Sequence, residues 1–272
     1  MKKKIFIVSF IFFILILLVF FYLLIIERNP TELPSNLLNK NVPKFEADSL
    51  IKKEKFISSE EFGNEIDMVD DANILHVEQT DKGVLRLTMD DQNSRNALSE
   101  AMMKSLIEEL TKASSNDSVR VVIISSYGPV FSAGHDLKEI TAARNQKDFG
   151  EAYFKSLFDT CSSLMQLIVS CPKPVIAEVA GTATAAGCQL VASCDLATAA
   201  DSVKFATPGV NIGLFCSTPM VALTRNVNKK NAMEMLLTGD MINAKKAKEI
   251  GLINNYFQTE ELTKETMALA NK

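Results

Sequence analysis

From residue 84 onward, short apolar runs typical of strands alternate with longer segments that have the periodicity of helices. Ser99 is a favourable helix N-cap, and the segment after it places Met102, Leu106 and Leu110 on one helical face. The strand-like runs are VLRLTM (84–89), SVRVVIIS (118–125), PVIAEVAG (174–181), DLATAA (195–200) and VKFATP (203–208), and further helices are predicted at 149–169, 184–194, 231–239 and 243–251. Strands that alternate with helices predict an α/β domain.

Composition excludes several classes of function. The chain has 272 residues, of which 47% are hydrophobic, and this is enough for one domain of about 200 residues with a sizeable core. The net charge is −4 and no basic patch is visible, which argues against a nucleic-acid partner. The five cysteines are scattered, without a C-x-x-C motif or a Cys/His cluster. We therefore predict no metal site and interpret the cysteines as small core residues.

The first 26 residues differ from the rest of the chain. A basic tip with three lysines (1–4) precedes 22 apolar residues at 5–26. A run of this length crosses a hydrocarbon core of roughly 30 Å, whereas a cleavable signal peptide has an apolar region of about 7–15 residues and a small-residue cleavage site. The sequence therefore predicts a membrane location through a single transmembrane helix at 5–26, with a cytoplasmic N-terminus. A polar linker at 27–67 and a folded domain at 68–272 complete the predicted organisation.

Two strands are each predicted to end in a turn of small residues that leads into a helix. The turns are Ala133-Gly134-His135 and the segment 182–187. The N–H groups at the start of a helix lack partners within that helix and carry the positive end of its dipole. If the two turns converge, they form an oxyanion hole for a carbonyl oxygen that gains negative charge during a reaction. Taken alone, each turn is better explained by close packing of a helix on a strand.

Several segments together resemble the crotonase (enoyl-CoA hydratase/isomerase) superfamily along residues 73–270. They are RNALS (95–99), VFSAGHDLKE (130–139), KPVIAEVAGTATAAGCQLVASCDLATAADSVKFATPGVNIGL (173–214) and TGDMINAKKAKEIGLIN (238–254). Within them, GHDLKE, ATAAGCQLVASCD and FATPGVNIGLFCSTP indicate one particular branch of the superfamily. The resemblance implies a crotonase-like spiral of ββα units.

The resemblance also implies an acyl-CoA thioester as the ligand, with coenzyme A as part of the substrate and no separate cofactor. Its carbonyl oxygen would lie between the backbone amides of His135 and Ala186. The backbone of Arg95, Asn96 and Ala97 would line the adenine pocket. The other residues that the resemblance places at the substrate are Ala133, Gly134, Asp136, Leu137, Lys138, Gly187 and Pro208. Asp136 is also predicted to cap the helix that follows it.

The sequence departs from the superfamily at the positions of two glutamates. Family hydratases use these glutamates as an acid/base pair on the water and the α-carbon of the substrate. The resemblance places the first at Gln189 and the second at Gly209. Gln189 cannot exchange a proton, although its amide can hold a water or a hydroxyl group, and Gly209 has no side chain. We therefore expect no standard enoyl-CoA hydration.

Four other side chains are candidates for chemistry. The imidazole of His135, with an ordinary pKa of about 6.5, suits a general base, and the alternative is that only its backbone faces the site. Glu139 is interpreted as facing solvent, with the acyl pocket as the alternative. Cys216 and Ser217 have no visible base beside them and are interpreted as lining the pocket.

Three functions follow from these observations. The first is an acyl-CoA enzyme with another chemistry, such as thioester hydrolysis or decarboxylation. The second is an acyl-CoA binder without turnover. The third comes from residues 1–60, which resemble the start of membrane-anchored thioredoxin-like proteins of cytochrome c maturation. We reject this thiol–disulfide activity because the chain has no Trp and no C-x-x-C motif.

The two resemblances meet at residues 64–72, which indicates a fusion or a fragment. Superfamily members continue past a segment like LTKETMALANK (262–272) into helices that cover the pocket and build a trimer. Because these helices are missing here, we expect a C-terminally truncated domain without the family-type homotrimer. The side of the membrane on which the domain lies stays open, since the lysines place it outside and CoA thioesters are used inside.

Overall fold

The computed structural model describes residues 74–272. The predicted basic tip (1–4), transmembrane helix (5–26), linker (27–67) and fusion boundary (64–72) lie outside the described residues. Among residues 74–272, no helix has both the length and the apolar character needed to cross a membrane.

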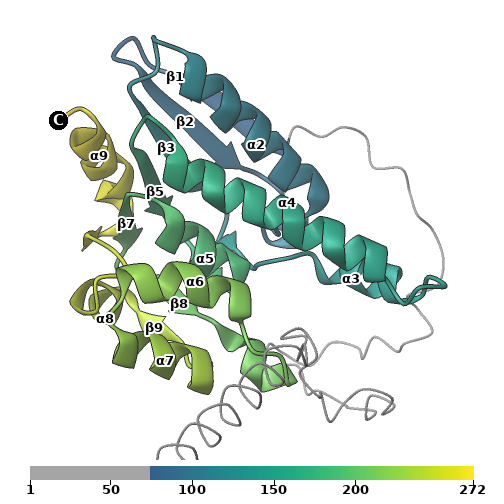
Figure 1. Cartoon of the computed structure of the whole chain (residues 1–272). Helices are drawn as coiled ribbons and strands as arrows, with labels where there is room; N and C mark the ends of the chain where they lie inside the picture. Colours follow the sequence, from purple (N-terminus) through teal and green to yellow (C-terminus); the bar gives the residue numbers. More distant parts are fainter. Residues whose placement is uncertain (1–73) are drawn as a thin grey trace, which may run out of the picture. The chain divides into compact units, whose positions relative to one another are not determined.

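The described strands form two sheets (Figure 1). The larger sheet has the order β1-β2-β3-β5-β7-β10, and all of its neighbours are parallel except β1 and β2. Its strands are β1 (Leu75–Gln79), β2 (Val84–Met89), β3 (Val121–Ser126), β5 (Val175–Val179), β7 (Leu196–Ala200) and β10 (Asn255–Phe257). The smaller sheet has the order β4-β6-β8-β9, and its strands are β4 (Val130–Ser132), β6 (Thr182–Thr184), β8 (Lys204–Ala206) and β9 (Ile242–Asn243).

The chain visits the two sheets in a repeated order. A strand of the larger sheet is followed by a short strand of the smaller sheet and then by a helix, as in β3-β4-α3 and β5-β6-α5. The helices are α2 (Glu100–Ser115), α3 (Leu137–Arg144), α4 (Glu151–Ser170), α5 (Ala186–Ser193), α6 (Ser217–Asn226), α7 (Lys229–Thr238), α8 (Ala244–Glu249) and α9 (Thr259–Ala270), with 3₁₀ turns η1 (Gln92–Ser94) and η2 (Pro208–Ile212). The predicted α/β class with a spiral of ββα units is confirmed.

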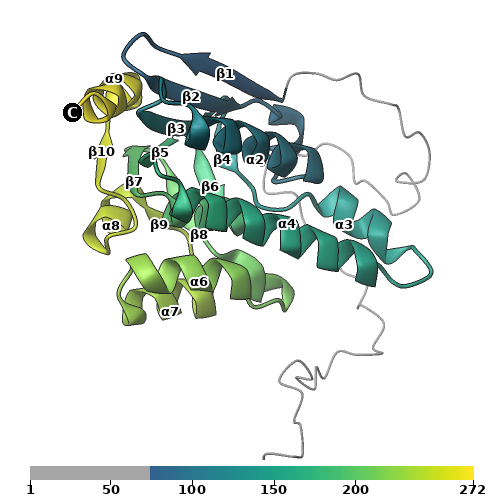
Figure 2. The same cartoon turned by 45° about the horizontal axis from the view of Figure 1, so that its top comes forward.

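The main core lies between the larger sheet and the helices α2 and α4, which run side by side (Figure 2). Ser99 caps α2 as predicted, because its side chain accepts a hydrogen bond of 3.2 Å from the Met102 N–H. The face of α2 that carries Leu106 and Leu110 is fully buried. Helix α9 covers part of the opposite face of the sheet, where Met267 and Leu269 pack against a buried cluster that includes Ile176.

Polar side chains lie between the larger sheet and α9. Arg86 and Glu178 form an ion pair across the sheet, and the Thr263 hydroxyl donates to the same carboxylate at 2.9 Å. Thr198 and Thr266 are hydrogen-bonded at 2.7 Å. Both Glu178 and Thr266 are buried, so these contacts fix the position of α9 on the sheet.

The predicted helix at 184–194 begins later than expected. Thr182–Thr184 form strand β6, which pairs with β4 on one side and β8 on the other, and the helix α5 starts at Ala186. Strand β4 at Val130–Ser132 was likewise not predicted. Both strands have only three residues, which is too short for an alternating pattern to be recognised in sequence.

Candidate functional site

Three parallel strands of the smaller sheet end at the same edge. Strand β6 lies between β4 and β8, and each strand is followed directly by a turn. The turns are bonded to one another, because the Thr184 hydroxyl donates to the Ala133 carbonyl at 3.1 Å and the Ala185 N–H donates to the Ala206 carbonyl at 3.0 Å. The topology thus places the turn at 133–136, the start of α5 and the start of η2 along one edge.

The first two turns are in direct contact at Gly134. This glycine has φ +97°, and a Cβ atom added to it would lie 2.9 Å from the Ala185 Cβ and 3.2 Å from the Ala186 nitrogen. Gly187 likewise allows α5 to approach β4 closely, since a Cβ there would lie 2.3 Å from the Ser132 carbonyl oxygen. Only glycine permits approaches this close. This geometry fits the alternative stated for each turn, close packing of a helix on a strand.

Two backbone donors are left free where the turns meet. Within residues 74–272, neither the His135 N–H nor the Ala186 N–H donates to a backbone oxygen. Ala186 is the first residue of α5, and the residue before it, Ala185, gives no side-chain cap. Ala185 has φ +50°, a left-handed conformation that costs an alanine free energy. The start of α5 therefore presents an uncapped, partly positive helix end beside the Gly134 turn.

The segment at 95–98 lies against the first turn. The Ala133 N–H donates to the Arg95 carbonyl at 3.1 Å, and the Leu98 N–H donates to the Gly134 carbonyl at 2.7 Å. Arg95 and Asn96 both have left-handed backbone conformations. The tertiary structure thus brings Arg95, Asn96 and Ala97 next to the turn at 133–136.

The side chain of Asn96 holds this segment in place. It is 1% exposed, its Oδ1 accepts from the Asp91 N–H at 2.8 Å, and its Nδ2 donates to the carbonyls of Tyr127 and Val130 at 2.9 and 2.7 Å. Asparagine adopts the left-handed conformation more readily than most residues. Asn96 therefore acts through its side chain within the protein, and only its backbone remains for a ligand.

The imidazole of His135 packs inward from the turn. Its Nδ1 lies 3.3 Å from the Leu98 carbonyl oxygen, and its ring meets the edge of the Phe158 ring with centroids 6.0 Å apart. Its Nε2 is buried and has no hydrogen-bond partner among the described residues. Burial lowers the pKa of His135, while the contact with Leu98 acts in the opposite direction. The imidazole is therefore neutral at neutral pH.

Gln189 is the residue at which the resemblance places the first family glutamate. It lies on α5 three residues after Ala186, is 6% exposed, and its Oε1 has no partner among residues 74–272. This is a buried polar atom on the helix that begins at Ala186.

Gly209 is the residue at which the resemblance places the second family glutamate, and the space around it is filled. A Cβ atom on Gly209 would lie 2.3 Å from the Leu214 carbonyl oxygen and 2.7 Å from the Cys216 Sγ. The segment 214–216 thus closes the place from which a glutamate side chain would extend. Burial raises the pKa of the Cys216 thiol. No carboxylate can replace Gly209 unless this segment moves.

The remaining predicted residues lie around the first turn and η2. Asp136 caps α3 as predicted, since its carboxylate accepts from the Lys138 N–H at 2.6 Å. Leu137 is 67% exposed and Lys138 points to solvent, while Pro208 begins η2.

The prediction for Glu139 is wrong, because this residue does not face solvent alone. Its carboxylate accepts from the Glu100 N–H at 3.2 Å and from the Tyr153 hydroxyl at 3.0 Å. Burial raises the pKa of Glu139, and these two hydrogen bonds oppose that shift. The residue joins α3 to the start of α2 and to α4.

Sequence reasoning missed two residues that shape the first turn and its surroundings. The Ser132 hydroxyl accepts from the Gly134 N–H at 3.3 Å and helps to shape the turn, and a small polar residue at the end of a strand was the available signal. Phe158 packs against His135 from the middle of α4. No local pattern identifies Phe158, because the contact depends on how α4 crosses the turn.

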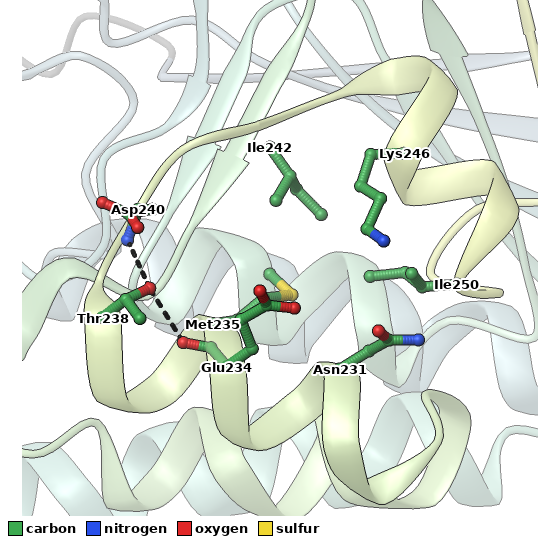
Figure 3. Close-up of a pocket in the computed structure, with 8 residues that line it drawn as sticks. All are labelled: Asn231, Glu234, Met235, Thr238, Asp240, Ile242, Lys246 and Ile250. Atoms are coloured by element: carbon green, nitrogen blue, oxygen red, sulfur yellow. Dashed lines mark hydrogen bonds between the residues drawn. The ribbon is translucent and has the colours of Figure 1, made fainter.

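A separate small pocket lies between α7, β9 and α8 (Figure 3). Met235, Ile242 and Ile250 contribute apolar surface, and Glu234, Asp240 and Lys246 are exposed at its rim. Its volume is about 90 Å³, room for about three waters. None of the predicted site residues lines it, and it is too small for an acyl-CoA.

Comparisons with known proteins identify relatives of residues 79–272. This range matches the model of the family described as Enoyl-CoA hydratase/isomerase. Enoyl-CoA hydratase domain-containing protein 3 of Mus musculus is 51% identical over 190 residues, and the Homo sapiens protein is 50% identical over 190 residues. These are members of the branch that the three sequence segments indicated. The match covers 70% of this chain and 62% of the mouse protein, so the chain spans less than two thirds of that relative's length.

Other relatives and solved structures agree with the family match. The 2,3-dehydroadipyl-CoA hydratase of Escherichia coli is 33% identical over 70% of this chain and 71% of its own. The crystal structure of human enoyl-CoA hydratase domain-containing protein 3 has a TM-score of 0.68 and 48% identity over 72% of this chain and 76% of that chain. The enoyl-CoA hydratase of Mycobacterium smegmatis has a TM-score of 0.69 and 45% identity over 72% of this chain and 75% of that chain.

The comparisons correct the predicted localisation. The mouse relative at 51% identity is named as a mitochondrial protein, which contradicts a protein held by a single-pass membrane anchor. The family match begins at residue 79, so it does not show the resemblance of residues 1–60 to thioredoxin-like proteins.

The sequence match over residues 79–272 and the spiral of ββα units lead to one conclusion: the chain belongs to the enoyl-CoA hydratase/isomerase family.

Proposed function

We propose that the domain binds an acyl-CoA thioester, with the carbonyl oxygen between the His135 and Ala186 N–H groups, and that it does not catalyse standard enoyl-CoA hydration. The observation that carries the proposal is the contact of the two turns at Gly134, which leaves these two donors unpaired within the described residues. Two preorganised amides suit an oxygen that carries partial negative charge. The relative named 2,3-dehydroadipyl-CoA hydratase supports a CoA thioester as the ligand.

The absence of hydration follows from the two replaced glutamates. Gln189 cannot take or give a proton, and Gly209 is enclosed by the Leu214 carbonyl and the Cys216 thiol. Hydration needs an acid/base pair on the water and the α-carbon. We expect the protein to leave crotonyl-CoA unhydrated when the loss of the enoyl absorbance is followed.

Calorimetric titration of the protein with two CoA ligands tests the binding mode. S-(2-oxopentyl)-CoA keeps a carbonyl oxygen and has no thioester bond to break, whereas S-pentyl-CoA lacks the carbonyl. Two hydrogen bonds at about 1 kcal/mol each predict that the ketone binds about 30-fold more tightly. Equal affinity for the two ligands would refute the proposal.

The variant Ala186→Pro tests the donor directly. Ala186 is the first residue of α5, a position at which helices accept proline, and the substitution removes the N–H. The preference for the ketone should fall to a factor of a few. Lys229→Pro, at the first residue of α7, is the matched control and should keep the full preference. Thermal unfolding followed by circular dichroism shows that each variant is folded.

A further inference from the structure

Two buried hydrogen-bond acceptors on the segments that follow β4 and β6 have no partner among the described residues. They are the Oε1 of Gln189 and the Nε2 of His135. The other unpaired buried side-chain atoms among residues 74–272 belong to Arg86, Ser126 and Glu178 on the larger sheet. Buried polar groups are almost always hydrogen-bonded, so two unpaired acceptors at one edge of a sheet indicate a missing donor.

The position of Gln189 directs its amide toward the turn. It follows Ala186 by three residues on α5, and residues with this spacing share one face of a helix. Helical side chains tilt toward the N-terminus of their helix. The end of α5 toward which the Gln189 side chain tilts is the end that carries the free Ala186 N–H.

The contacts of His135 determine which nitrogen carries the proton. A carbonyl oxygen can only accept, so the contact between Nδ1 and the Leu98 oxygen places the hydrogen on Nδ1. The Nε2 atom then has a free lone pair, and burial keeps the ring neutral by lowering the pKa. A neutral imidazole with a free lone pair can accept a hydrogen bond or a proton.

The missing donor is best supplied by water. An unsubstituted acyl chain has no N–H or O–H group beside its thioester carbonyl, so it cannot satisfy either acceptor. A water molecule has two O–H donors, which matches the two acceptors. It would lie beside the carbonyl group that the two amides hold.

We infer that His135 Nε2 and Gln189 Oε1 hold a water molecule that hydrolyses the bound thioester, and this inference rests on the proposed function. The water oxygen bonds to the carbonyl carbon as its proton passes to His135 Nε2. The N–H groups of His135 and Ala186 stabilise the resulting oxyanion. The C–S bond then breaks, and the imidazolium returns the proton to the departing thiolate, so that the products are a carboxylic acid and free CoA.

The charged and titratable groups near His135 are hydrogen-bonded to groups other than its imidazole. Glu139 on α3 accepts from the Tyr153 hydroxyl of α4 and from the Glu100 backbone, and Asp136 caps α3. None of them is hydrogen-bonded to the imidazole. The rate of hydrolysis should therefore rise with pH as one group loses a proton and level off near or below pH 6.5, the ordinary pKa of histidine.

The test is the release of CoA from butyryl-CoA by the full chain, measured by a thiol reagent against protein alone. We expect His135→Gln to lower the rate about 100-fold or more and to remove the pH dependence, because a general base contributes at least this factor. Gln189→Leu should lower it about tenfold. Both variants should bind S-(2-oxopentyl)-CoA within about threefold of the wild type, since the amide donors remain. The controls His76→Gln and Gln166→Leu alter side chains outside the site and should keep the wild-type rate.

The outcomes separate the inference from the proposed function. Tight binding of the ketone without CoA release from butyryl-CoA overturns the inference and leaves the proposed function standing. Release at the wild-type rate by His135→Gln, with the ketone still bound, also overturns it. Failure of the wild-type protein to bind the ketone refutes the proposed function itself.

Discussion

The substitution Gly134→Ala tests the geometry of the two turns. Gly134 has φ +97°, and the added methyl group would lie 2.9 Å from the Ala185 Cβ and 3.2 Å from the Ala186 nitrogen. A side chain in the left-handed region costs about 1–2 kcal/mol, and overpacking adds about 1–3 kcal/mol. We therefore expect the free energy of unfolding to fall by about 3.5 kcal/mol, which lowers the Tm of a domain of this size by about 7–14 °C.

Gly128→Ala is a matched control for backbone strain. Gly128 has φ +83°, and the three atoms nearest to a Cβ there would all belong to the side chain of Gln92, whose flexible end can move away. The control should therefore lose only the conformational part, about 1–2 kcal/mol. Urea unfolding of both variants, followed by circular dichroism, gives the difference due to packing between the turns.

The two variants should also differ in ligand binding. The methyl group of Gly134→Ala occupies the space in front of the Ala186 N–H, so we expect the preference for S-(2-oxopentyl)-CoA over S-pentyl-CoA to disappear. Gly128→Ala should keep it. The reasoning is refuted if Gly134→Ala costs no more stability than Gly128→Ala and still prefers the ketone.

Two further predictions concern carboxylates. The double variant Gln189→Glu/Gly209→Glu should not hydrate crotonyl-CoA measurably and should be less stable than the wild type, because the space at Gly209 is closed. Hydration at the rate of a family hydratase would contradict this and show that the segment after η2 moves freely. Burial raises the pKa of Glu139 against opposing hydrogen bonds from Tyr153 and Glu100, so the folded state holds this proton more tightly than the unfolded state. The wild type therefore loses stability as the pH rises from about 4 through the raised pKa of Glu139. Over that pH range, urea unfolding should show that Glu139→Gln becomes more stable relative to the wild type. A difference in stability that does not depend on pH would contradict this.

Much of the fold could be predicted from local sequence. The cap of α2 at Ser99 and the cap of α3 at Asp136 depend on residues within one helical turn, so the pattern alone identified them. The expected departures at Gln189 and Gly209 also needed no coordinates, because they concern residue identity. The strands β4 and β6 were missed because a three-residue strand has no readable period and forms only by pairing with distant neighbours.

The sequence by itself determined the α/β class, the two small-residue turns and the absence of a carboxylate at positions 189 and 209. Only the tertiary structure decided that the turns touch at Gly134, that segment 214–216 closes the space at Gly209, and that His135 packs between Leu98 and Phe158. The reason is physical: caps and turns arise from contacts within a few residues, whereas these arrangements join residues far apart in the chain. Whether a buried acceptor such as Gln189 Oε1 has a partner depends on every element packed around it.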